Sequence, residues 1–397
     1  MKTKNFFHAA ALMLGLACTG FMAAACSDDD NNGGNGDTDF DQAANLDYTA
    51  ANSANWLAYS VRVANLLEQD ATSLYDAWET SYDGGAPFKE IFKAHDGRQS
   101  YSNVMDCITT IIDKCQEITD EVGNEKIGDP YRKWMAGQHT EALYAVESWY
   151  SFHSRDDYAN NIRSIRNSYF NSMDSTICDH SLYRLMERVD PALNTQIAQA
   201  IEDTKNAILA IPQPFRNHIG DDMVPPAQDA CTALGTLFNT SLRSAIATAY
   251  QNGTVGEADL QAVVEAYVDN VVLPTYKDLK EKNALLRQAV QALAGTPSND
   301  AFESACDAWI VARQPWEQSE AFLFGPVDAM GLDPNMDSWP LDQVAIVNIL
   351  NSGDFGNLEW NEGDSEDQIT STQEIRGFHT LEFLLFKNGN PRTVPAE

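Results

Sequence analysis

The sequence predicts an all-α protein built from two helical bundles. After residue 50, apolar residues recur every three or four positions, and the apolar–polar alternation typical of strands is scarce. Two proline-rich stretches, Pro212–Pro214 and Val224–Pro226, interrupt this periodicity near the middle of the chain. We therefore place the first bundle at residues 41–218 and the second at residues 219–397.

Seven segments carry the helical pattern. The first helix is expected over Ala54–Trp78, because Leu57, Ala64 and Leu67 fall on one face of a helix. The other expected helices are Val104–Ile118, Asn194–Ile211, Cys231–Tyr250, Leu260–Leu293, Phe302–Phe322 and Thr372–Phe386. Pro274 lies within the fifth segment, where it should break or kink the helix near residue 273.

Residues 1–25 are expected to be a lipoprotein signal peptide. Lys2 and Lys4 precede an apolar stretch that ends at Cys26, the expected lipidation site. The stretch is too short, and lacks the flanks, for an uncleaved membrane span. Residues 26–40 are acidic and rich in glycine and asparagine, which predicts a flexible tether. We expect an outer-membrane lipoprotein at the cell surface or on the periplasmic face.

The charge of the chain excludes some classes of partner. Asp and Glu total 58 against 26 Lys and Arg, so the formal net charge is −32. A nucleic-acid binder needs cations that face phosphates, and docking on an anionic membrane needs them as well. The acidic surface is compatible with a protein that handles metal cations, but it does not establish that function.

The strongest candidate for chemistry is the segment Gly377–Phe386. His379 and Glu382 are three residues apart, so they share a helix face and could bind one cation. The same pair is also consistent with a hydrogen bond on a helix surface. It does not form the HExxH motif of zinc peptidases, because Thr380 and Phe383 occupy the required Glu and His positions.

Two further segments combine aromatic and polar residues. Trp309, Arg313, Trp316 and Glu320 recur every three or four residues, and an arginine in such a face usually binds a carboxylate. The segment from residue 147 to residue 158 is dense in hydrogen-bonding groups. Core aromatic residues beside surface charges would explain both segments equally well.

Taken together, these segments resemble the imelysin-like family. Its GxHxxE signature is matched by Gly377, His379 and Glu382. The other family motifs are W-x-x-x-R-x-x-W-x-x-S-E-A-F-x-F-G-P over 309–326, W-P-L-D over 339–342 and E-S-x-x-S-x-x-S-x-x-D over 147–157. The resemblance covers most of residues 50–390, and it implies two four-helix bundles side by side with a site at their interface.

The order of the motifs differs from that of most relatives. Here GxHxxE ends the chain and the E-S block precedes the other motifs, which predicts a circularly permuted imelysin-like topology. The helix expected to follow GxHxxE would be supplied by Trp56–Trp78. Permutation is tolerated when the termini are close together, so we expect residue 45 to lie near the C-terminus.

The resemblance implies binding of a metal ion or an iron-containing ligand in a cleft between the bundles, in iron uptake or homeostasis. Iron is the expected metal, with zinc as the second choice, and envelope iron-transport proteins are the expected partners. The expected ligands are His379, Glu382, Glu320 and Asp328. The residues expected around them are Gly377, Arg313, Trp316, Trp339, Glu147, Ser148 and Ser151.

Two other functions compete with metal capture. The family was first classed with the metallopeptidases, so a zinc peptidase using the HxxE pair is the main alternative. It gains support if a second histidine, such as His153, approaches His379. The ligand argument favours a non-enzymatic protein and leaves the assignment open. A site that has lost its metal and serves in adhesion is the third alternative.

Overall fold

The computed structural model describes residues 46–361 and 363–395, and it confirms the all-α class. Residues 1–45, which include the predicted signal and Cys26, lie outside the described residues. The longer helices are α2 (Ser53–Glu79), α4 (Val104–Asp120), α7 (Ser154–Phe170), α9 (Pro191–Ala210), α10 (Val224–Thr236), α11 (Arg243–Gln251), α12 (Glu257–Tyr267), α13 (Leu273–Gly295), α14 (Asn299–Glu317), α17 (Gln343–Ser352) and α19 (Gly377–Leu385).

Shorter elements connect these helices. The short α-helices are α3 (Phe88–Ala94), α5 (Gly128–Met135), α6 (His139–Tyr144), α8 (Leu182–Val189), α15 (Pro326–Ala329), α16 (Leu332–Asp337) and α18 (Glu366–Gln373). Short 3₁₀ turns are η3 (Arg98–Ser100), η5 (Phe215–Asn217) and η8 (Glu320–Phe322), and π turns are η4 (Glu121–Lys126), η6 (Leu237–Leu242) and η7 (Val268–Val272). The strands β1 (Phe386–Lys387) and β2 (Asn390–Pro391) pair in antiparallel fashion.

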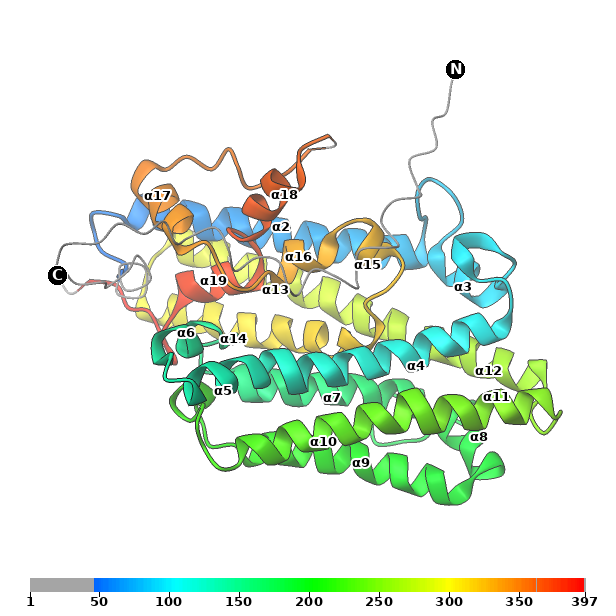
Figure 1. Ribbon diagram of the computed structural model, residues 1–397. Coiled ribbons are helices and arrows are strands. Elements are labelled where there is room, and N and C mark those ends of the chain that lie inside the picture. Colours follow the sequence, from blue (N-terminus) through cyan, green and yellow to red (C-terminus); the bar gives the residue numbers. More distant parts are fainter. Residues whose placement is uncertain (1–45, 362, 396–397) are drawn as a thin grey trace.

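The helices form two bundles that lie side by side (Figure 1). The first bundle consists of α2, α13, α14 and α19: α2 packs on α13 and α19, and α14 packs on α13 and α19. The second consists of α4, α7, α9 and α10, with α7 and α10 both packed on α9 and on α4. The bundles do not separate at residue 218, because α2 joins helices from the second half of the chain. The second bundle is instead a continuous stretch of sequence between α2 and α13.

Most helices predicted from periodicity are present within a few residues of the expected bounds. Pro274 follows η7, the wider π turn over Val268–Val272, and the helix continues into α13. A proline lacks the N–H of a regular helical turn and its ring needs extra space, which a wider turn provides. The proline therefore distorts the helix rather than ending it.

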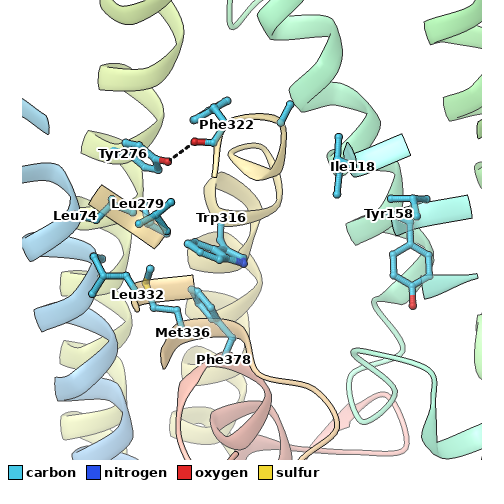
Figure 2. Packing of buried hydrophobic residues seen from close by; sticks show 14 of the residues in the cluster. Leu74, Ile118, Tyr158, Tyr276, Leu279, Trp316, Phe322, Leu332, Met336 and Phe378 are labelled. Carbon is cyan, nitrogen blue, oxygen red and sulfur yellow. Dashed lines mark hydrogen bonds between the residues drawn. The ribbon is translucent and has the colours of Figure 1, made fainter. Parts of the chain in front are cut away.

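The core of the first bundle extends to the interface between the bundles. Figure 2 shows Leu74, Leu279 and Leu332 on one side of Trp316, with Ile118 on the α4 ribbon across from it. The Tyr276 hydroxyl donates a hydrogen bond of 3.1 Å to the carbonyl of Phe322, which fixes η8 against α13. All seven of these residues are at most 4% exposed. The segment that follows α14 is thus anchored to the first bundle where the second bundle meets it.

The two ends of the described chain are adjacent, as the sequence predicts. The Arg392 guanidinium donates to the carbonyl of Leu46 over 2.9 Å, and the Lys387 amine donates to Asp47 over 2.6 Å. Helix α2 also packs on α19, where the Trp56 indole donates to the carbonyl of Leu384 over 2.9 Å. This adjacency is compatible with a permuted order, but the permutation itself stays a prediction.

In the part of the chain that the structure describes, every helix is too short or too polar to cross a bilayer.

Candidate functional site

A buried cluster of charged side chains fills the interface between the bundles. Its members come from α14, η8, α16 and α19 of the first bundle and from α7, η4 and the 147–153 loop of the second. Charges removed from water require partners, because an unpaired buried charge is costly.

Arg313 on α14 is the central cation of the cluster. Its guanidinium forms an ion pair with Asp337, another of 2.6 Å with Glu317, and a longer one of 3.7 Å with Asp157. Burial alone would lower the pKa of Arg313, but the three carboxylates raise it well above its ordinary value. Arg313 therefore stays charged and connects α14, α16 and α7.

Asp337 ends α16 and contacts three different groups. Besides Arg313, it accepts a hydrogen bond of 2.6 Å from the Trp316 indole, and its other oxygen lies 3.2 Å from Nε2 of His379. Burial would raise the pKa of Asp337, but Arg313 and His379 lower it far below its ordinary value. Asp337 is the anionic centre of the site.

His379 lies on α19 and is fully buried. Its Nδ1 lies 3.1 Å from Glu382, on the opposite side of the ring from Asp337, and the Trp339 ring meets it edge-on at a centroid distance of 4.9 Å. Burial and Arg313 would lower the pKa of His379, but the two carboxylates raise it to about 9. The protonated ring can donate to both carboxylates, and an Arg313 guanidinium nitrogen lies 3.3 Å from Nε2.

Glu382 is held from the second bundle. Its Oε1 accepts hydrogen bonds from the Ser151 backbone N–H, at 2.8 Å, and from the Ser151 hydroxyl, at 2.7 Å. The adjacent Ser148 hydroxyl donates to Asp157 over 2.6 Å, and His153 bonds the other oxygen of Asp157 over 2.8 Å. The predicted serines therefore orient carboxylates of the cluster.

Gly377 allows α19 to start next to α16. It has φ of +86°, which only glycine adopts without strain, and a Cβ there would lie 2.5 Å from the carbonyl oxygen of Met336. Any side chain would push α19 away from α16. The glycine of the GxHxxE motif thus places His379 within reach of Asp337.

Lys126 provides a second buried cation at the other end of the cluster. It lies on the π turn η4, and its amine is 3.1 Å from Glu147, 3.3 Å from Glu121 and 3.9 Å from Glu320. Burial would lower its pKa, but these carboxylates raise it well above its ordinary value. The Glu121 side chain is 48% exposed, so this end of the cluster reaches the surface.

Three carboxylates lie close enough together that they could hold a metal ion. One oxygen each of Glu317, Glu320 and Asp337 lie within 4.8 Å of one another. Burial raises the pKa of Glu317 to about 8 and that of Glu320 well above its ordinary value, despite the lowering effects of Arg313 and Lys126 respectively. A cation between these oxygens would stabilise their charged forms, and carboxylate ligands suit hard divalent cations such as Mg, Ca and Mn.

The structure brings together most of the residues predicted for the site, in different roles. Glu320 belongs to the carboxylate cluster, whereas His379 and Glu382 pair with each other and His379 reaches the cluster through Asp337. Asp328 lies on α15 with an exposed side chain and is not part of this cluster. Arg313 contacts Glu317 rather than Glu320.

The sequence reasoning missed Glu317 and Asp337. Glu317 follows Arg313 by four residues, a spacing at which opposite charges meet on a helix. The sequence therefore does indicate this ion pair. Asp337 carries no such pattern, because α16 brings it to α14 from 24 residues along the chain. The local indication of its role is that it lies two residues before Trp339, the start of the W-P-L-D motif.

Comparisons with known proteins agree with this architecture. The Peptidase_M75 (imelysin) family model matches residues 28–241 and 272–396. The crystal structure of an imelysin peptidase from Bacteroides ovatus matches with a TM-score of 0.87 at 56% identity, covering 89% of this chain and 100% of that one. Iron-regulated protein A of Synechococcus elongatus is 37% identical over 129 residues, a segment that spans only 32% of each protein. The extent of the family match and the shared fold show that this chain belongs to the imelysin family.

Proposed function

We propose that this protein binds a metal cation, with iron as the expected metal, at the carboxylates of Glu317, Glu320 and Asp337, and serves in iron uptake or homeostasis at the cell envelope. The observation that carries the proposal is the convergence of three carboxylate oxygens within 4.8 Å at the interface of the bundles. Such a cluster is the ligand chemistry of hard and borderline divalent cations.

The charge balance of the site supports cation binding. Five carboxylates have side chains at most 5% exposed, whereas three cations, Arg313, Lys126 and His379, are buried to the same degree. The five carboxylates are those of Asp157, Glu317, Glu320, Asp337 and Glu382. A bound cation would offset this excess of negative charge. Without a cation, some of the carboxylates must be protonated.

The surrounding residues position the ligands. Trp316 and Arg313 fix the rotamer of Asp337, and Asn161 on α7 donates 2.6 Å to Glu317 Oε2. His379 offers an imidazole next to Asp337, and it would need to lose a proton before it could bind the metal directly. The partly exposed Glu121 and Glu147 provide an acidic approach for a cation from solvent.

Two further observations support iron as the metal and the cell envelope as the location. The relative from Synechococcus elongatus is named an iron-regulated protein, although it matches only about a third of this chain. The predicted signal at residues 1–25 and the lipidation site Cys26 favour an outer-membrane lipoprotein, at the cell surface or on its periplasmic face. Envelope iron-transport proteins are the partners that we propose.

The peptidase alternative lacks a second imidazole at this site. His153 bonds Asp157 over 2.8 Å, and both ring nitrogens of His379 face carboxylates. A zinc peptidase needs an open metal position that holds a water molecule. The arrangement therefore suits the binding of a cation better than the activation of a water molecule.

Titration calorimetry of Fe(II), Fe(III) and Zn(II) tests the proposal, with Fe(II) handled under anaerobic conditions. The Glu317→Gln/Glu320→Gln variant should lose stoichiometric binding. A matched control, Glu303→Gln/Asp307→Asn, removes two exposed acids from the same helix α14 and should bind as the wild type does. A further variant, His379→Ala/Glu382→Ala, separates a carboxylate-centred site from a histidine-centred one.

The outcomes of these titrations distinguish the proposed site from the alternatives. Loss of binding in the Glu317/Glu320 variant supports the proposed site. No binding by the wild type, or equal binding by the wild type and this variant, would overturn it. If Zn(II) binds and a peptide substrate is cleaved, the peptidase alternative replaces the proposal.

A further inference from the structure

The second bundle contains a pocket of about 320 Å³ between α7 and α9. Two buried isoleucines line it together with charged side chains, which are those of Arg163, Arg166, Lys205, Asp174 and Glu202. This volume is at the lower end of the range for small-molecule sites, roughly 300–1,000 Å³. Three cations in one pocket are unexpected in a chain with 58 acidic and 26 basic residues.

The two arginines of the pocket have few partners. Arg163 donates to the carbonyl of Met173 over 3.3 Å, and Arg166 donates to the carbonyl of Ser172 over 3.2 Å and to Asn167 over 3.4 Å. Among the residues that the structure describes, neither guanidinium forms an ion pair with a carboxylate. Each guanidinium has five N–H donors, so most of them are available for a ligand.

The acids of the pocket are already engaged. Glu202 forms an ion pair with Lys205 one turn along α9. Asp174 accepts hydrogen bonds from the Thr176 backbone N–H at 2.7 Å and from the Ser172 hydroxyl at 2.8 Å, which help lower its pKa to about 2. Asp174 and Glu202 still act on Arg166 through their charge and would raise its pKa, yet among the described residues neither forms an ion pair with Arg163 or Arg166.

The arginines also repel each other. They are three residues apart on one face of α7, and burial together with the charge of Arg163 lowers the pKa of Arg166. The Arg166 guanidinium lies over the Phe170 ring at 4.8 Å, which holds it at the pocket. Two adjacent guanidinium groups provide the paired donors that recognise an oxyanion.

We propose that the pocket between α7 and α9 binds a small oxyanion with two or more negative charges, such as a polycarboxylate or a phosphate. Arg163 and Arg166 would donate to its oxygens, and the Ser175 hydroxyl lines the same pocket. The pocket lies on the opposite side of α7 from Asp157 and Asn161, the residues that face the carboxylate cluster. The anion site is thus separate from the proposed metal site.

Calorimetric titration of the full chain with inorganic phosphate, and separately with citrate, tests this inference. The protein is first treated with a chelator and desalted, because citrate also binds metals, and sodium chloride at matched ionic strength provides the blank. The Arg163→Gln/Arg166→Gln variant is compared with Arg184→Gln/Arg188→Gln on α8, which removes the same charge from arginines that already have acidic partners.

We expect saturable binding of at least one anion at one site per chain. It should weaken about tenfold or more in the Arg163/Arg166 variant and stay unchanged in the α8 control. Preference for phosphate would indicate a phosphorylated ligand, and preference for citrate a polycarboxylate. Absence of saturable binding by either anion, or equal binding by the Arg163/Arg166 variant and the wild type, would overturn the inference. Thermal melting of both variants checks that the fold is intact.

Discussion

Helices α2 and α7 both lie inside a bundle, yet they bury different kinds of side chain. The buried face of α2 is almost entirely apolar and includes Trp56, Leu67 and Leu74. Helix α7 instead buries many polar side chains, which are Ser154, Asp157, Asn161, Ser164, Asn167 and Ser168. Only the apolar face gains from leaving water, so α2 holds the fold together while α7 supplies polar groups to the interface.

The polar groups of α7 are tolerated because they have specific partners. Asn161 donates to Glu317, the Ser164 hydroxyl accepts a hydrogen bond of 2.9 Å from the Ala321 N–H, and Asp157 faces His153 and Arg313. A hydrogen-bonded polar group costs little to bury, whereas an orphaned one costs much more. Disturbing α7 and its partners should therefore have different consequences from disturbing α2.

The largest effect is expected at Arg313, which neutralises carboxylates from three helices. Arg313→Gln should lower the free energy of unfolding by about 3–5 kcal/mol, because it leaves buried carboxylates without a cation. Urea unfolding measures the change. Arg287→Gln removes a half-exposed ion pair with Glu68 and should cost about 1 kcal/mol or less. Equal losses in the two variants would show that the cluster is not specially dependent on Arg313.

The apolar face of α2 provides the second test. Leu74→Ala should cost about 3 kcal/mol, because it opens a cavity at a fully buried position. The loss should be the same with or without added metal, since Leu74 touches none of the proposed ligands. Leu285→Ala is the matched control, because its side chain is 57% exposed and the loss should be within about 0.5 kcal/mol.

The pair of His153 and Asp157 predicts a dependence of stability on pH. Burial would lower the pKa of His153, but Asp157 raises it to about 9, above its ordinary value of 6.5. The pair therefore stabilises the folded state fully below pH 6.5, and this contribution is lost as pH rises through 9. It is expected to be on the order of 3 kcal/mol.

Unfolding free energies at pH 6 and pH 9.5 measure this contribution. Between pH 6 and pH 9.5, the free energy of unfolding should fall more in the wild type than in His153→Gln. His180 is exposed, so His180→Gln should show the same pH dependence as the wild type. A variant lacking His153 with the same pH dependence as the wild type would refute the assignment.

The smallest effect concerns Lys126. Its ammonium lies 3.9 Å from Glu320 and competes with any cation bound there. Lys126→Met should therefore increase the affinity for divalent metal about tenfold, as measured by calorimetry. Lys114→Met on α4, which removes a partly exposed lysine paired with Glu117, should leave the affinity unchanged. A weaker affinity in Lys126→Met would mean that Lys126 supports the site, and an unchanged affinity would mean that it does not compete with the metal.

Periodicity predicted the helices well because each has one apolar face. The helix expected over Ala54–Trp78 is α2, and that over Val104–Ile118 is α4, each within two residues of the expected bounds. The segment Thr372–Phe386 is instead two helices, α18 and α19, separated just before Gly377. Gly377 lies where α16 approaches closely, and it has a positive φ. No local sequence pattern reveals that approach.

The site was harder to predict than the fold. Motifs located Arg313, Glu320 and His379 because these residues recur at regular spacing within short segments of the sequence. Asp337 reaches the cluster through tertiary folding, whereas Asp328, two residues beyond the 309–326 motif, is exposed and lies outside the cluster. Sequence spacing therefore identifies the neighbours of the site, whereas the choice of which carboxylate turns inward depends on packing.

The insertion of one bundle within the sequence of the other determines when each can form. The helices from α4 to α12 are continuous and can pack as soon as they leave the ribosome or the translocation channel. Helix α2 must wait, because its indole partner on α19 lies 328 residues further along the chain. Its apolar face stays exposed during synthesis, which makes it the natural contact for a holding chaperone. The first helix of the described residues is thus among the last to be buried, and the carboxylate cluster is complete only after Asp337 has been made.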